Sequence, residues 1–268
     1  MSYFKNLKDY QAYLNENPFH EVIPDFVFDK SISLDQKIVR DTYYSVTPDM
    51  EDVYTAELDD LIRLHFLVTS RRSLNVMEFG SGFSTAVISH ALQYNKEKYQ
   101  DFVKENLRKS DPFRITTIEN SKKWAEETKK KLKFNNVDFH VSNNQMTTFN
   151  GRICTMFETL PNLSPDFIYL DGPDQFSAKG NVNGITTDHI ERLPMSGDLL
   201  KIEHFLLPGT LIVVDGRTAN ARFLKANFQR DWDYHYFEEF DQHFFELSEE
   251  PLGIYNKKQI EFSKNLLR

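Results

Sequence analysis

The stretch Glu78-Phe79-Gly80-Ser81-Gly82-Phe83-Ser84 decides the fold of this 268-residue chain. The residues that lead into it, 74–79, form a short apolar run that is typical of a buried strand. Two glycines then permit a tight turn, and Ser84-Thr85 is a suitable N-cap for the apolar run 86–92. The stretch therefore predicts a strand, a glycine turn and a helix in direct succession.

The same alternation continues along the chain. Further strands are expected at 113–119, 137–141, 165–171 and 210–215, and helices at 51–66, at 124–132 and before 207–209. Strands that alternate with helices form parallel sheets, and the runs 232–240 and 243–247 predict an antiparallel pair at the end. We expect an α/β fold with a doubly wound, mostly parallel seven-stranded sheet. It would occupy residues 51–268, after an N-terminal helical or irregular extension at 1–50.

Composition excludes several classes of protein. Acidic residues outnumber basic ones, 40 to 32, so the surface repels phosphate backbones and no nucleic-acid partner is expected. Cys154 is the only cysteine, which excludes an intrachain disulfide and a cysteine-based metal cluster. The first residues lack the apolar core of a secretory signal, and the apolar run 205–214 is too short to span a bilayer. We expect a cytoplasmic protein with a small-molecule substrate and no membrane partner.

Two features at the carboxyl ends of the expected strands suit a ligand, because open parallel sheets bind ligands at that edge. The turn 80–84 lets a ligand approach the backbone, and Glu119 could accept hydrogen bonds from both hydroxyls of a ribose. The alternatives are a turn without a ligand and a solvated acid at a helix start. A dinucleotide site fits less well, because Thr85 replaces the third glycine and Glu78 would face a pyrophosphate.

These motifs resemble, in order, those of the class I S-adenosylmethionine-dependent methyltransferases. The stretch 78–84 resembles their motif I, an acid-x-Gly-x-Gly pattern, and 165–171 resembles the motif that closes their fourth strand. Residues 206–215 resemble the passage from a helix into the fifth strand, and the resemblance covers about residues 60–255. It implies a Rossmann-like fold, S-adenosyl-L-methionine as cofactor and transferase activity.

The resemblance also implies a set of cofactor-binding residues at the strand ends: Glu78, Gly80, Ser81, Gly82, Ser84, Glu119, Asn143 and Asp171. Within this set, Glu78 and the two glycines would surround the methionine part of the cofactor. Glu119 would bind the ribose, and Asn143 falls where the family contacts adenine.

The acceptor side is expected at the ends of the fourth and fifth strands. His189 is the candidate general base, because a neutral imidazole can take a proton from a hydroxyl at pH 7, and Asp171 joins it as a catalytic residue. The alternative for His189 is a surface or capping histidine on a helix that begins near Asp188. Asp215 and Arg217 are candidate substrate-binding residues, although Arg217 could instead pair with Asp215 or Asp171. The polar loop 176–184 could close over a substrate.

A metal is not expected at these strand ends. Methyltransferases of the catechol type bind Mg²⁺ there, but Gly216 stands where they supply an asparagine ligand. We therefore expect a methyltransferase that acts on a small polar metabolite, such as the hydroxyl of a sugar. A non-catalytic scaffold with the same fold and an NAD-dependent oxidoreductase are the alternatives. The extension 1–50 could cover the active site, mediate a homodimer or pack inertly.

Overall fold

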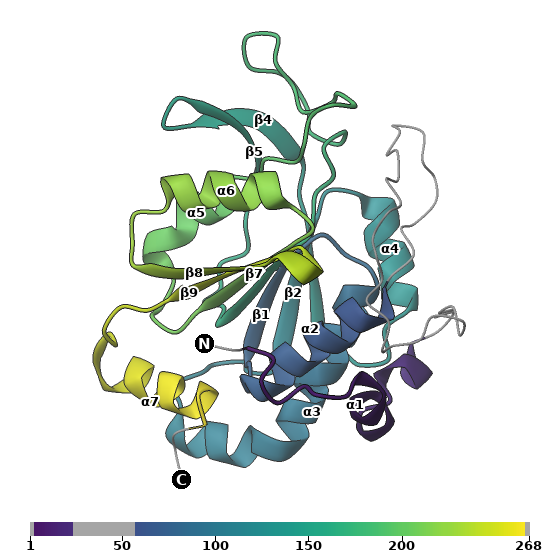
Figure 1. Cartoon of the computed structure of the whole chain (residues 1–268), viewed down its shortest axis with the longest axis vertical. Helices are drawn as coiled ribbons and strands as arrows, with labels where there is room; N and C mark the ends of the chain where they lie inside the picture. Colours follow the sequence, from purple (N-terminus) through teal and green to yellow (C-terminus); the bar gives the residue numbers. More distant parts are fainter. Residues whose placement is uncertain (1–2, 24–56, 266–268) are drawn as a thin grey trace.

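A computed structural model describes residues 3–23 and 57–265, which include a seven-stranded sheet (Figure 1). In spatial order its strands are β3 (Val137–Val141), β2 (Arg114–Glu119), β1 (Asn75–Phe79), β6 (Phe167–Leu170), β7 (Leu211–Asp215), β9 (Gln242–Leu247) and β8 (Trp232–Phe237). The first five run parallel, and β9 runs antiparallel to both of its neighbours. The predicted mostly parallel sheet with an antiparallel pair at the end of the chain is confirmed.

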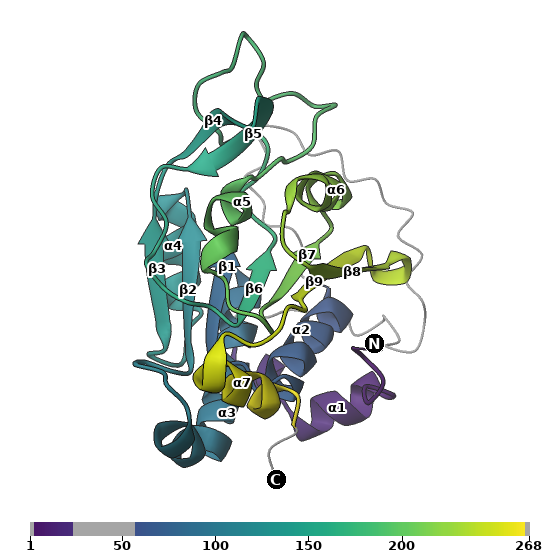
Figure 2. The same cartoon turned by 90° about the vertical axis from the view of Figure 1, so that its left-hand side faces the viewer.

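Helices cover both faces of the sheet (Figures 1 and 2). One face packs on α2 (Leu58–Ser70) and α3 (Phe83–Asn106), and the other packs on α5 (Asp198–Ile202) and α6 (Thr218–Asn227). Side chains of a strand alternate between the two faces. On β7, for example, Val213 packs with the first pair of helices, whereas Ile212 and Val214 pack with the second. Burial on both faces explains why the parallel strands are continuous apolar runs.

Shorter elements complete the described part of the chain. They are α1 (Tyr10–Glu16), α4 (Lys122–Lys130), α7 (Gly253–Ser263) and the short 3-10 helices η1 (Phe19–Val22), η2 (Glu203–Phe205) and η3 (Glu238–Phe240). The Ser121 side chain caps α4 by accepting a 3.3 Å hydrogen bond from the Trp124 N–H. No helix among the described residues is long and apolar enough to cross a membrane.

A hairpin after β3 was not predicted. It consists of β4 (Asn144–Phe149) and β5 (Arg152–Phe157), which pair only with each other as a second sheet. Asn150 and Gly151 form its two-residue turn, with φ angles of 49° and 75°. The Asn-Gly pair is a strong hairpin signal in a sequence, because both residues tolerate positive φ. Asp198 at the start of α5 anchors the hairpin by accepting a 2.8 Å hydrogen bond from the Phe157 N–H.

Other boundaries differ from the expected ones. The helix expected at 51–66 is α2, whose bounds are Leu58–Ser70; the residues 49–56 and the boundary between 50 and 51 lie outside the described residues. α3 continues to Asn106, so it includes much of the charged stretch 95–111. A helix beginning near Asp188 was one of the alternatives for His189. That alternative is wrong, because turns and bends occupy this part of the loop between β6 and α5.

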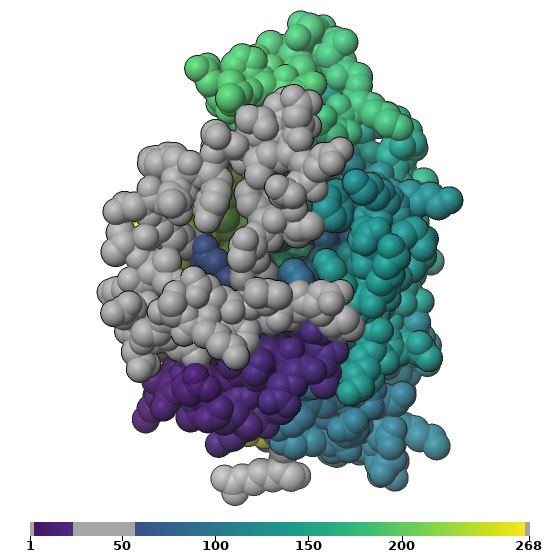
Figure 3. Space-filling model, turned by 90° about the vertical axis from the view of Figure 1, so that its right-hand side faces the viewer, coloured from purple at the N-terminus to yellow at the C-terminus, as the bar shows by residue number. Residues whose placement is uncertain are grey.

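Residues 3–23 pack against the main body. Leu14 and Phe19 share an apolar cluster with Ile62 of α2 and Val87 of α3. In Figure 3 this segment, coloured purple, lies directly against the blue and teal atoms of the main body. The described part of the predicted extension is therefore an integral layer over α2 and α3.

Candidate functional site

The loops that follow β1 and β6 touch through their backbones. Gly80 has a φ of +96°, a conformation that favours glycine. A Cβ on Gly172 would lie only 2.5 Å from the Gly80 Cα and 2.6 Å from its nitrogen. Glycine at 172 is therefore required by the close approach of the two loops. This contact brings the carboxyl end of β6 against the glycine turn.

Glu78 lies beneath that turn and is 1% exposed. The Ser84 hydroxyl donates to its Oε1 at 2.7 Å, and the Thr85 hydroxyl donates to its Oε2 at 2.6 Å. Thr85 in turn accepts the Gly82 N–H at 3.0 Å. Burial raises the pKa of Glu78 to about 7, while these hydroxyl groups lower it. The carboxyl group thus organises the turn through two side chains, a role of Thr85 that was not predicted from the sequence.

Gly82 opens onto free space at the start of α3. Its φ of 167° is extended backbone that any residue adopts, and an added Cβ would meet no atom of residues 3–23 or 57–265 within 4 Å. The fold itself therefore does not require glycine here. As far as the described residues go, the turn leaves space at the N-terminus of a 24-residue helix, where backbone N–H groups can bind a ligand.

Glu119 at the end of β2 faces the same turn. Its Oε2 accepts a 2.7 Å hydrogen bond from the Ser81 hydroxyl, and its Oε1 accepts a 2.8 Å bond from the Ser121 N–H. Glu119 is 6% exposed, and burial raises its pKa while the bonds from Ser121 and Ser81 lower it. A carboxylate offers about four lone-pair sites, so about two remain for a ligand.

Two asparagines follow β3. The exposed Asn143 donates to Glu158 Oε2 at 2.9 Å and accepts from Lys179 Nζ at 2.6 Å. Asn144 is 1% exposed, and within the described ranges neither atom of its side-chain amide has a hydrogen-bond partner. A buried amide normally has partners. Asn144, which was not predicted as a site residue, thus has a buried donor and acceptor without partners among the described residues, at the strand end where adenine contact is expected.

Arg217 binds the loop after β6. Its Nη1 donates to the Pro173 carbonyl at 2.7 Å and its Nη2 donates to the Asp171 carbonyl at 2.5 Å. Its Nε lies 3.8 Å from Asp171 Oδ1. These contacts correspond to the structural pairing that was the alternative to substrate binding.

The two acids at these strand ends have different surroundings. Desolvation raises the pKa of Asp171, the nearby Arg217 lowers this pKa, and the Asp215 carboxylate raises it. The Asp171 side chain is 55% exposed, so solvent screens all three effects. Asp215 accepts a hydrogen bond from the buried Tyr169 hydroxyl, whose pKa is raised by burial. Asp171 is therefore the more accessible of the two carboxylates.

His189 lies in an exposed turn of the loop between β6 and α5. Its Nδ1 accepts a 3.1 Å hydrogen bond from the Glu191 N–H. Within residues 3–23 and 57–265, no hydrogen bond connects the ring to Asp171 or to the glycine turn. Its role as a base stays a prediction.

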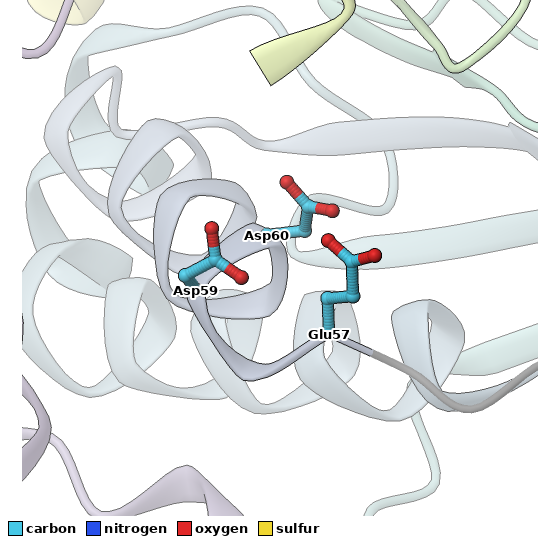
Figure 4. Close-up of side chains that lie close together, drawn as sticks. All are labelled: Glu57, Asp59 and Asp60. Atoms are coloured by element: carbon cyan, nitrogen blue, oxygen red, sulfur yellow. The ribbon is translucent and has the colours of Figure 1, made fainter. Parts of the chain in front are cut away.

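Three carboxylates lie together at the start of α2: Glu57, Asp59 and Asp60 (Figure 4). Arg63 forms ion pairs with Asp59, at 2.8 Å, and with Asp60. A helix N-terminus favours negative charge. The helix dipole and Arg63 therefore stabilise the charges of Asp59 and Asp60.

Comparisons with known proteins find matches among solved structures only. The chain matches no family model and no curated protein. Similar solved structures include the O-methyltransferase TomG from Streptomyces achromogenes in complex with SAM, which is 15% identical over 92% of this chain and 95% of that chain, with a TM-score of 0.39. An O-methyltransferase from Bacillus cereus in complex with SAH is 13% identical over 92% and 96%, with a TM-score of 0.39. The SAH-bound methyltransferase PaMTH1 from Podospora anserina is 14% identical over 72% and 80%, with a TM-score of 0.42.

Similarity at these levels does not transfer an activity or a substrate to this chain. The strand order and the single antiparallel strand, β9, instead define the fold directly. It is the class I methyltransferase fold that the motifs implied, with the glycine turn after β1 at the carboxyl edge of the sheet.

Proposed function

We propose that the protein is an S-adenosylmethionine-dependent methyltransferase that acts on a hydroxyl group of a small polar metabolite. The observation that carries this proposal is the placement of Glu119 and Gly82 around one turn. Glu119 keeps unused lone pairs at the end of β2, and Gly82 leaves free space at the start of α3.

The chemistry of these groups fits the cofactor. A ribose diol needs acceptors for two hydroxyl protons, and the Glu119 carboxylate can supply them. The methionine part carries an ammonium and a sulfonium group, and Glu78 places a carboxyl group with a pKa of about 7 beneath the turn. Ser84 and Thr85 separate that carboxyl group from the turn surface, so its effect on a bound cation is electrostatic.

The bound cofactor supplies an electrophilic methyl group, and the chain has to align the acceptor with it. Alignment alone contributes much of the rate of such a transfer, so a dense catalytic cluster is not needed. The exposed Asp171 carboxylate lies beside the turn through the Gly172–Gly80 contact. Asp171 and His189 stay the residues predicted to handle the acceptor proton.

Calorimetric titration with S-adenosylmethionine, S-adenosylhomocysteine and NADH separates this proposal from its alternatives. We expect both sulfur nucleotides to bind below millimolar concentration and NADH not to bind. Binding of NADH alone would support an oxidoreductase, and no binding of any of the three would support a scaffold. Radiolabelled methyl transfer to a panel of hydroxylated metabolites then tests turnover.

A further inference from the structure

A depression of about 200 Å³ lies at the carboxyl end of β7. It is lined by Leu193 and Pro194 of the loop before α5, by residues 216–220 at the start of α6, and by Asp241 after η3. β1, β6 and β7 are neighbours in the sheet, so about 10 Å separates the end of β7 from the end of β1. The depression therefore lies beside the proposed cofactor site without overlapping the glycine turn.

Arg217 connects the depression to that site but does not offer it a free charge. The side chain is only 10% exposed, and both terminal nitrogens donate to the carbonyls of Asp171 and Pro173. An anionic ligand is normally held by a free guanidinium fork. Because the fork of Arg217 is already occupied, it cannot hold a carboxylate or phosphate, and the first turn of α6 offers the depression only a partial positive charge.

The carboxylate of Asp241 is a charged group that a ligand in the depression can reach, because its side chain is 37% exposed. The Thr218 hydroxyl donates to Asp241 Oδ1 at 2.7 Å, and the Tyr236 hydroxyl lies 3.3 Å from the same oxygen. Among the residues that the structure describes, these hydrogen bonds all end on Oδ1. Oδ2 is thus left to accept a hydrogen bond from a ligand.

A buried histidine fixes the position of Thr218. His243 is 1% exposed; its Nε2 lies 2.9 Å from Thr218 Oγ1, and its Nδ1 lies 2.9 Å from the Tyr234 hydroxyl. Burial lowers the pKa of His243, so its ring is neutral. If Tyr234 donates to Nδ1, then Nε2–H donates to Thr218 and the Thr218 proton is directed at Asp241. One consistent chain of hydrogen bonds therefore holds the Asp241 carboxylate in place.

We propose that this depression binds the methyl acceptor, and that the acceptor is a small molecule rich in hydroxyl groups that carries no negative charge. Asp241 accepts a hydrogen bond from one acceptor hydroxyl, and Leu193, which is 59% exposed, contacts the C–H face of its ring. The volume is below the roughly 300–1,000 Å³ of sites for drug-sized ligands, which favours a single ring over an oligomer. This inference rests on the proposed methyltransferase function.

Saturation-transfer NMR with S-adenosylhomocysteine present tests the proposal. The probes are two matched methyl glycosides, neutral methyl glucoside and anionic methyl glucuronide. We expect the neutral probe to bind at least tenfold more tightly than the anionic one, which the Asp241 carboxylate repels. Equal or tighter binding of the anionic probe would overturn the proposal.

Three variants separate the depression from the rest of the fold. Asp241→Asn and Thr218→Val should each weaken binding of the neutral probe about tenfold and leave affinity for S-adenosylhomocysteine unchanged. Asp101→Asn, on an exposed position of α3, is the matched control and should change neither. If Asp241→Asn binds the neutral probe as tightly as the unmodified protein does, the acceptor site is overturned. The acceptor site alone is also overturned if the unmodified protein binds S-adenosylhomocysteine but neither probe. Loss of cofactor binding by the unmodified protein would overturn the proposed function as well.

Discussion

Replacement of Glu78 by glutamine should make the protein more stable at alkaline pH. Glu78 is 1% exposed, and burial raises its pKa from 4.5 to about 7. The folded state therefore binds the proton more tightly than the unfolded state. The stability that protonation contributes is fully present below pH 4.5 and is lost as the pH rises through 7. The neutral amide introduced by Glu78→Gln carries no charge at any of these pH values and avoids this loss.

The size of the effect follows from the two pKa values. A difference of one between the folded-state and unfolded-state pKa corresponds to about 1.4 kcal/mol, and integration between pH 5 and pH 8 gives about 2.5 kcal/mol. The amide can still accept from Thr85 and can donate to Ser84, so the turn keeps its connections. The difference in unfolding free energy, variant minus unmodified protein, should therefore increase by about 2.5 kcal/mol from pH 5 to pH 8.

Urea denaturation followed by circular dichroism at the two pH values measures this difference. Glu105→Gln, on an exposed position of α3, is the control and should show the same pH dependence as the unmodified protein. A change below about 0.5 kcal/mol for Glu78→Gln would refute the reasoning. It would mean that the carboxyl group is solvated and does not support the turn from within the core.

Three further substitutions have distinct expected outcomes. Gly172→Ala should lower the unfolding free energy by about 3 kcal/mol or more, because its Cβ would lie 2.5 Å from the Gly80 backbone; denaturation that matches the unmodified protein would contradict the close contact. Gly82→Ala should change stability by less than about 1 kcal/mol, because its Cβ meets nothing within 4 Å, yet it should weaken S-adenosylhomocysteine binding at least tenfold in calorimetry. Full affinity would show that the space beside the turn is not used. Arg217→Lys should cost about 1–3 kcal/mol in thermal unfolding, because lysine cannot reach both loop carbonyls; an unchanged Tm would argue against the structural role.

The parallel part of the fold was predictable because its signals are local. Each buried strand is an apolar run that ends in polar or glycine residues, and the alternation with helices determines the sheet type. The β4–β5 hairpin was not predicted, although Asn150-Gly151 marks its turn. Only Met146 and Phe149 are apolar in β4, which is too few for an apolar run, and the pairing of Asn144 with Phe157 becomes visible only in the structure.

Some of the geometry of the candidate site was predictable from the sequence, and some was not. The sequence assigned Ser81, in the turn after the first strand, and Glu119, at the end of the next strand, to the same ligand. In the structure the Ser81 hydroxyl lies 2.7 Å from Glu119 Oε2. The role of Gly172 depends on a backbone contact with Gly80, which no local pattern reveals. In the same way, the hydrogen bonds of Arg217 to the β6 loop join residues that are 44 and 46 positions apart.

The central claim is that Glu119 binds the ribose of an adenosine-type cofactor beside the glycine turn. Calorimetric titration of S-adenosylhomocysteine into the unmodified protein and into Glu119→Ala tests it most directly. Loss of two hydrogen bonds to a carboxylate should weaken binding by about 3 kcal/mol, or roughly a hundredfold. Equal affinity of the two proteins would contradict the assignment of Glu119 and with it the proposed cofactor site.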